Sequence, residues 1–261
     1  MPFADVNGQH IYFEDSGGNG AAVIFSHGFL MDHDMFEAQV AALAAEFRCI
    51  TWDERGFGAT PATSDFTYWD SADDALALLS HLGIERAFFV GMSQGGFISM
   101  RAAVRAPERV LGLGLIDTQA GLESEEARPV YDAMTDDWEA NGLSDDVAVV
   151  ISSIILGSGC DDASWIAKWH AIPKENVRVP YRTLVGRDDI SDRLAAVTPP
   201  AIVFHGDADA AIPMEKAEQL LAELGNCEEL VRIPGAGHAS NVSHAAAVNG
   251  PLLAFLRRHR G

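Results

Sequence analysis

Short, uninterrupted apolar runs alternate along the chain with longer stretches that repeat apolar residues at helical spacing. The apolar runs predict buried strands, because a strand that is covered on both faces has no polar side. These runs are 21–25, 47–52, 87–90, 110–116, 201–204 and 230–233. The helical stretches are 36–47, 72–82, 94–106, 214–224 and 245–258. Such alternation predicts an α/β fold with a doubly wound, mostly parallel sheet.

The alternation is interrupted between residues 120 and 196. Apart from 181–185, which resembles a strand, this segment has no strand-like run, and it carries Trp138, Trp165 and Trp169, three of the five tryptophans. We predict a helical cap over 120–196, inserted before the strand that begins at Ala201, and a core formed by 1–119 and 197–261. Sites at the ends of open sheets need shielding from water, so we expect the cap to act as a lid whose tryptophans bind substrate.

Charge narrows the choice of partner. The 261 residues include 18 Lys and Arg against 38 Asp and Glu, which gives a net charge of −20. So strong a negative field repels nucleic-acid phosphates and anionic membranes, and we expect neither as a partner. A small-molecule substrate is the expected ligand, and the sequence leaves the oligomeric state open, a homo-oligomer included.

The cysteines and the N-terminal residues add two further expectations. Cys49, Cys160 and Cys227 show no C-x-x-C spacing, so we expect neither a disulfide framework nor a zinc site. The first residues contain no basic region followed by an apolar block, and no apolar run is long enough to span a bilayer. We therefore expect a cytoplasmic protein.

The clearest candidate chemistry lies in Gly91-Met92-Ser93-Gln94-Gly95, between the 87–90 strand and the 94–106 helix. This segment matches the G-x-S-x-G nucleophile elbow. A serine on so sharp a turn has a strained backbone, so the residues two before and two after it must be small. The helix N-terminus also favours negative charge that develops beside it. We predict that Ser93 is a nucleophile.

A serine hydroxyl needs a neighbouring base that removes its proton. Among nine histidines, His238 is the best candidate, because it follows the last predicted strand in a glycine-rich loop. His33 and His244 lie near motif segments and are weaker alternatives, whereas His205 ends a strand and is expected to be structural.

Three carboxylates are candidates to orient the imidazole of His238. Asp207 and Asp209 follow the 201–204 strand, and Asp117 follows the 110–116 strand. All three lie between Ser93 and His238, which is the chain order of one known class of serine hydrolases. The residues by themselves leave the choice open.

Acyl transfer passes through an oxyanion, which needs preorganised hydrogen-bond donors. We expect two backbone N–H groups to supply them. One belongs to Gln94, the residue after the nucleophile, and the other to Phe29 in the loop that follows the 21–25 strand.

Another turn, 53–58, combines acidic, basic and glycine residues. We interpret it as structural, because an Arg–carboxylate pair would pin this loop beside the site. No catalytic role is assigned to Asp53 or Arg55.

Taken together, five segments resemble the α/β-hydrolase superfamily: 27–29, 53–58, 91–96, 206–209 and 237–238. The resemblance covers essentially the whole chain and implies the α/β-hydrolase fold, with 120–196 as the helical cap of the family. It implies that Asp209, the last residue of a Gly-x-x-Asp segment, is the acid that completes a triad with Ser93 and His238. It also implies that no cofactor and no metal is needed.

Within the superfamily the chain is most similar to small carboxylesterases, enol-lactonases of the 3-oxoadipate type and cofactor-free haloperoxidases. Epoxide hydrolases and haloalkane dehalogenases carry Asp at the position of Ser93, so their chemistry is not expected. Leu30 stands where many relatives have proline, which weighs against perhydrolase activity.

We therefore expect a serine hydrolase that cleaves a small to medium carboxylic ester or lactone through an acyl-enzyme on Ser93. The same triad could hydrolyse a C–C or an amide bond. A third alternative is a ligand receptor with this fold and little turnover, whose cap closes on the ligand. Residues 120–197 hold 15 acidic against 7 basic side chains, which weighs against a dianionic lactone.

Overall fold

An eight-stranded sheet forms the centre of the computed structural model, which describes residues 3–62, 64–122, 128–157, 160 and 162–260. The strand order is β1-β2-β4-β3-β5-β6-β7-β8. Neighbouring strands from β4 to β8 are parallel, whereas β1 with β2 and β2 with β4 are antiparallel. The strands are β1 (Phe3–Val6), β2 (Gln9–Asp15), β3 (Ala22–Ser26), β4 (Arg48–Trp52), β5 (Ala87–Met92), β6 (Val110–Ile116), β7 (Ala201–Gly206) and β8 (Cys227–Ile233).

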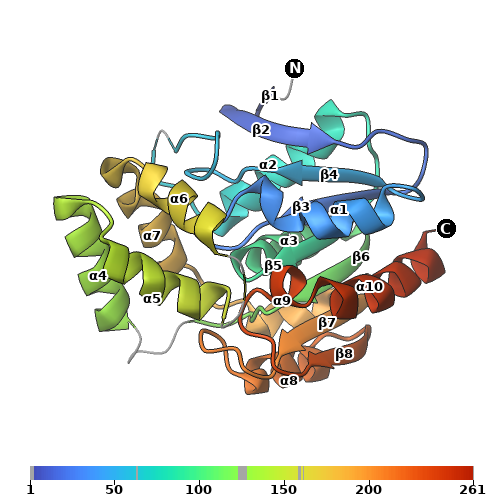
Figure 1. The fold of residues 1–261 in the computed structure, drawn as a ribbon. Coiled ribbons are helices and arrows are strands. Elements are labelled where there is room, and N and C mark those ends of the chain that lie inside the picture. Colours follow the sequence, from blue (N-terminus) through green and yellow to red (C-terminus); the bar gives the residue numbers. More distant parts are fainter. Residues whose placement is uncertain (1–2, 63, 123–127, 158–159, 161, 261) are drawn as a thin grey trace.

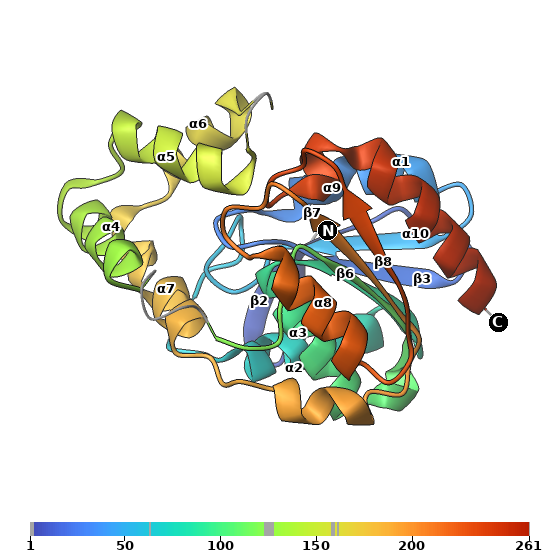
Figure 2. The same cartoon turned by 90° about the horizontal axis from the view of Figure 1, so that it is seen from below.

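Helices cover both faces of this sheet (Figures 1 and 2). One face carries α1 (Glu37–Leu43), α9 (Ser240–Ser243) and α10 (Ala245–His259). The other face carries α2 (Tyr68–His81), α3 (Gln94–Arg105) and α8 (Met214–Glu223). Each helical layer packs on its own cluster of buried apolar side chains, so the core has two layers separated by the sheet.

The predicted α/β fold class is confirmed. The continuous apolar runs form strands because both of their faces are covered: β3, β5 and β7 are buried along their whole length. In parallel sheets of this kind the polar residues after each strand meet at one edge, which is where ligands bind.

The N-terminal hairpin of β1 and β2 was not predicted. Asn7 and Gly8 connect the two strands with positive φ angles of 50° and 74°. An Asn-Gly pair between two strands is the strongest short-range signal for such a hairpin. The Asn7-Gly8 pair therefore indicates the hairpin in the sequence. The two strands give no clear signal of their own, because they are short and mixed in polarity.

Among the described residues, four α-helices lie between β6 and β7 in the chain, beyond the carboxyl ends of the parallel strands (Figure 1). They are α4 (Arg128–Asn141), α5 (Asp145–Ile155), α6 (Ala163–Ala171) and α7 (Arg178–Val185). The strand-like interpretation of 181–185 is wrong, because this run forms the end of α7. Short apolar runs do not distinguish a strand from a buried helix by periodicity. None of the described helices is long and apolar enough to cross a membrane.

Candidate active site

Ser93 lies on the sharp turn between β5 and α3. Its φ of 50° and ψ of −114° are unusual for a residue with a side chain, and its N–H donates to the carbonyl of Ile116 at 2.9 Å. A Cβ atom on Gly91 would overlap the backbone of Gly95, and one on Gly95 would overlap the carbonyl of Ser26. The G-x-S-x-G spacing therefore follows from backbone crowding on both sides of the turn.

The structure brings Ser93, His238 and Asp209 together at the carboxyl edge of the sheet. His238 Nε2 lies 3.0 Å from Ser93 Oγ, and His238 Nδ1 lies 2.8 Å from Asp209 Oδ2. Ser93 is 7% exposed, His238 is 6% exposed, and the side chain of Asp209 is 1% exposed. In such an arrangement the imidazole can remove the proton of the hydroxyl. The carboxylate then stabilises the imidazolium that forms.

The carboxylate of Asp209 is held on both oxygens. Its Oδ1 accepts the backbone N–H of Ala211 at 2.8 Å and that of Ile212 at 2.9 Å. Burial would by itself raise the pKa of Asp209, but the charge and hydrogen bond of His238, with the Ile212 N–H, bring this pKa below its ordinary value. The carboxylate is therefore kept ionised and aimed at the imidazole.

Asp207, the second candidate acid, points elsewhere. Its carboxylate is exposed, and Oδ1 accepts the backbone N–H of Gly235 at 2.6 Å. Gly235 lies in the turn before His238, so Asp207 braces the loop that carries the base.

Asp117, the third candidate acid, is completely buried behind the triad. Its Oδ1 accepts the N–H of Gly206 at 2.8 Å, and its Oδ2 accepts the N–H of Ser240 at 2.9 Å. Burial raises the pKa of Asp117 to about 6. Asp117 thus connects the end of β7, which precedes Asp209, with the start of α9, which follows His238.

The two backbone donors expected for the oxyanion lie in the loop after β3 and at the start of α3. The N–H groups of Phe29 and Gln94 have no hydrogen-bond acceptor among the described residues. Phe29 lines the same cavity as Ser93, and Gln94 is the first residue of α3. The loop packs against the end of β5, because a Cβ on Gly28 would overlap Sδ of Met92. Unpaired donors beside a nucleophile are the arrangement that an oxyanion requires.

The side chain of Gln94 is fixed by Glu54 of the 53–58 turn and by Tyr68, which the sequence did not single out. Its Nε2 donates to Glu54 Oε2 at 2.6 Å, and its Oε1 accepts the hydroxyl of Tyr68 at 3.0 Å. The N–H of Glu54 in turn donates to His27 Nε2 at 3.0 Å. Burial raises the pKa of Glu54 well above its ordinary value, which favours the neutral acid. The 53–58 turn therefore supports both segments that carry the unpaired donors.

The Arg–carboxylate pair predicted for this turn forms with Asp74 of α2. Arg55 Nη2 donates to Asp74 Oδ1 at 2.8 Å. Asp53 is also buried, and its Oδ2 accepts the N–H of Ala59, the residue after this turn, at 2.7 Å. Both contacts fit the structural interpretation of 53–58.

The alternative histidines have other partners. His33 Nδ1 lies 2.7 Å from Asp53 Oδ1, and His244 Nδ1 lies 3.0 Å from the hydroxyl of the preceding serine. His205 is buried, with Nε2 at 2.8 Å from the carbonyl of Ile212. Of the histidines considered, His238 is the one that the structure brings to Ser93.

A cavity of about 120 Å³ lies over Ser93 and His238. Helices α4, α5 and α7 contribute much of its wall. Trp138 lines this cavity, whereas Trp165 and Trp169 are not among the described residues that line it. Trp169 instead lines a second cleft, between α6 and the loop after β3.

Much of the cavity wall was not predicted from the sequence. Val177, Tyr181 and Leu184 have the spacing of one helical stripe, which could have identified the inner face of α7. The lining residues of α4 and α5 have the same kind of spacing, at 131, 134, 135 and 138 and at 151, 154 and 155, so a stripe was readable there as well. These include Met134, Ile151 and Ile154.

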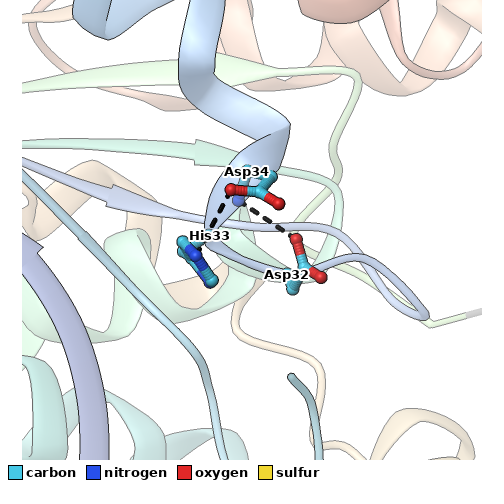
Figure 3. Close-up of side chains that lie close together, drawn as sticks. All are labelled: Asp32, His33 and Asp34. Atoms are coloured by element: carbon cyan, nitrogen blue, oxygen red, sulfur yellow. Dashed lines mark hydrogen bonds and ion pairs between the residues drawn. The ribbon is translucent and has the colours of Figure 1, made fainter. Parts of the chain in front are cut away.

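A separate group of ionisable side chains, Asp32, His33 and Asp34, lies at the start of the short helix η1 (His33–Phe36) (Figure 3). The N–H of Asp34 donates to Asp32 Oδ1 at 3.1 Å, and His33 Nε2 lies 3.3 Å from Asp34 Oδ1. Lys168 of α6 places its ammonium 2.7 Å from Asp32 Oδ2 and 2.6 Å from Asp34 Oδ2. This ammonium already offsets the negative charge, so the group connects α6 to the core.

Known proteins share this fold along nearly the whole chain. Residues 21–245 match the family model described as alpha/beta hydrolase fold. The 3-oxoadipate enol-lactonase 1 of Acinetobacter baylyi is 27% identical over 229 residues, which cover 86% of this chain and 84% of that protein. The structure of a thermophilic esterase from Thermogutta terrifontis is 28% identical, with a TM-score of 0.84 and coverage of 97% and 95%. The enol-lactonase structure from Burkholderia xenovorans is 25% identical, with a TM-score of 0.87 and coverage of 98% and 100%.

Proposed function

Because the chain belongs to the alpha/beta hydrolase fold family, we propose that it hydrolyses a small to medium carboxylic ester or lactone through an acyl-enzyme on Ser93. The relatives named above include an esterase and enol-lactonases, which favours this reaction class. One observation carries the mechanistic part of the proposal. It is the hydrogen-bonded series from Ser93 Oγ through the His238 ring to Asp209, at 3.0 and 2.8 Å.

In the first half of the reaction, Ser93 Oγ attacks the carbonyl carbon while His238 Nε2 takes the hydroxyl proton. The carbonyl π electrons move onto its oxygen, which accepts the N–H groups of Phe29 and Gln94. When this oxyanion collapses, the bond to the leaving oxygen breaks. The leaving oxygen takes the proton from His238, and the acyl group stays on Ser93.

In the second half, water attacks the acyl carbon and gives its proton to His238. Collapse of the second oxyanion releases the carboxylic acid, and His238 returns the proton to Ser93 Oγ. Asp209 keeps the Nδ1 side of the ring oriented and stabilises the imidazolium in both halves. Its lowered pKa supports this role, because the carboxylate stays charged near neutral pH.

We also propose that residues 120–196 act as the lid of this site. The helices α4, α5 and α7 supply side chains to the cavity wall above Ser93, among them Trp138. A cover of this kind excludes bulk water from the reacting carbonyl and strengthens the electrostatic contacts beneath it.

A fluorophosphonate probe and a short-chain p-nitrophenyl ester test the proposal together. The wild-type protein is expected to be labelled at Ser93 and to hydrolyse the ester. Ser93→Ala should lose the label and lower ester turnover by about 10³-fold, judging from other catalytic triads. Ser80→Ala, which removes an exposed hydroxyl on α2, is the matched control and should behave as wild type.

Two results would contradict the proposal in different ways. Wild-type turnover in Ser93→Ala would remove Ser93 from the mechanism. Labelling at Ser93 without turnover of any ester or lactone would instead favour a ligand receptor with this fold.

A further inference from the structure

We propose that the cavity selects esters or lactones whose groups are uncharged and apolar, and that it rejects substrates that carry a carboxylate. This inference rests on the proposed function and adds the chemical class of its substrate. It comes from what lines the cavity and from the partners that the basic side chains of the cap bind.

The lining of the cavity contains no Lys, Arg, Asp or Glu among the eighteen described residues that form it. Its walls are built from aliphatic, aromatic and methionine side chains, for example Met134, Trp138 and Ile154. Apart from His238, no side chain of this set can be positively charged. A carboxylate that entered here would lose its hydration without gaining a counter-ion, which is strongly unfavourable.

Polar groups in the lining have partners of their own. The hydroxyl of Thr135 donates to the carbonyl of Tyr131 at 2.8 Å, one turn back on α4. The hydroxyl of Tyr181 donates to Asp132 Oδ1 at 2.6 Å, so this oxygen faces an acidic group. The hydroxyl hydrogen of Tyr181 is therefore used by Asp132 and is not offered to a substrate carboxylate.

The basic side chains of the cap have partners outside the lining of the cavity. Seven Lys and Arg lie between residues 120 and 196, and each of them contacts a partner that does not line the cavity. The partners are carboxylates for Arg128, Lys168, Arg178, Arg182 and Arg193, and backbone carbonyls for Lys174 and Arg187. The guanidinium of Arg187 donates to the carbonyl of Gly121, which does not line the cavity, and to the carbonyl of Leu184, which does, and it lies over the ring of Phe97.

The charge of the whole protein acts in the same direction. A net charge of −20 lowers the local concentration of anions, and the cap itself is acidic. The size of the cavity sets a further limit. An apolar cavity of about 150 Å³ is known to hold benzene, so a space of about 120 Å³ suits a short acyl chain or a small ring.

A pair of p-nitrophenyl esters tests this selectivity on the wild-type enzyme. One is the pentanoate, and the other is the mono-ester of glutaric acid, which has the same chain length and a terminal carboxylate. We expect the kcat/KM of the pentanoate to be at least about 100-fold higher. Comparable values for the two esters would overturn the inference and leave the proposed hydrolase function intact.

A charge placed in the cavity should reverse part of this preference. Ile154→Arg introduces a cation from α5 and is expected to narrow the ratio of the two kcat/KM values by at least about 10-fold. Val149→Arg is the matched control, since Val149 lies on the same helix, is 60% exposed and does not line the cavity. Met134→Arg on α4 provides a second variant if Ile154→Arg does not fold.

Binding to Ser93→Ala separates the inference from the chemistry. Calorimetry with 2-heptanone and with 6-oxoheptanoate compares a neutral ligand with its carboxylate analogue. We expect binding of the ketone to be the tighter by at least about 10-fold. If the oxoheptanoate binds as tightly as the ketone or more tightly, the inference is overturned, whether or not the wild type hydrolyses the esters. Absence of turnover with a preserved preference for the ketone would instead count against the proposed function alone.

Discussion

The indole nitrogen of Trp169, on α6, donates a hydrogen bond of 2.8 Å to the backbone carbonyl of Leu30. Trp169 is completely buried, and Leu30 has a positive φ of 64°, which is rare for a residue with a branched side chain. Leu30 directly follows Phe29, whose N–H is one of the two unpaired donors. A helix of the cap therefore holds the loop that would form half of the oxyanion site.

Replacement of this indole should weaken the oxyanion site. Trp169→Phe keeps an aromatic ring but removes the hydrogen bond, so the Leu30 backbone can relax. We expect kcat for a p-nitrophenyl ester to fall by about 10-fold with little change in KM, because the donor matters most in the transition state. Loss of one buried hydrogen bond should also lower the unfolding free energy by about 1 to 2 kcal/mol.

Trp165→Phe is the control for this variant. Trp165 is buried on the same helix and has no described contact with Leu30. Its replacement should lower stability to a similar extent without the fall in kcat. If the two variants lower kcat equally, Trp169 has no specific positioning role.

The choice of catalytic acid can be tested with two neighbouring carboxylates. Asp209→Asn removes the charge that faces His238 and disturbs the tautomer of the ring, so kcat should fall by about 10³- to 10⁴-fold. Asp207→Asn leaves an acceptor for the Gly235 N–H and should lower kcat by less than about 5-fold. Steady-state kinetics of both variants provide the measurement, and the opposite ranking would reassign the acid.

The buried carboxyl of Asp117 should leave a signature in the pH dependence of stability. Its pKa of about 6 lies above the ordinary value of 3.8, so the folded protein binds this proton more tightly than the unfolded chain does. The stabilising contribution is complete below about pH 4 and is lost as the pH rises through about 6. A shift of this size corresponds to about 2 to 3 kcal/mol.

Asp117→Asn isolates this contribution. Urea unfolding of both proteins between pH 4 and 7 should show that the wild type loses about 2 kcal/mol relative to the variant as the pH rises. The absolute stability of the variant is expected to be lower, because an amide offers one acceptor for the N–H groups of Gly206 and Ser240. Parallel curves over this range would contradict the raised pKa.

Glu54 should act as a neutral group. Burial raises its pKa well above the ordinary value, and Gln94 Nε2 donates to its Oε2. Glu54→Gln keeps an acceptor oxygen without charge, so kcat should stay within about 3-fold of wild type. Glu54→Ala releases the Gln94 side chain and should lower kcat by about 10-fold. A large loss in the Gln variant would show that the charge of Glu54 is required.

The sequence by itself determined the parallel part of the sheet and the position of the candidate nucleophile. Apolar runs such as 87–90 and 201–204 identify strands because burial on both faces leaves no polar position. The G-x-S-x-G segment identifies Ser93 because its small residues are required locally, as the crowding at Gly91 and Gly95 shows. The Asn7-Gly8 pair of the N-terminal hairpin was an equally local signal, because both residues adopt positive φ angles.

Only the tertiary structure decided the contacts between residues that lie far apart in the chain. Three carboxylates, Asp117, Asp207 and Asp209, end neighbouring strands, and only their placement in space assigns the contact with His238 to Asp209. The resemblance favoured this residue, but the residue pattern did not. Likewise, composition suggested that all three cap tryptophans face the substrate, whereas Trp138 lines the cavity and Trp169 supports a loop. Apolar periodicity reports that a side chain is buried, and packing determines what it is buried against.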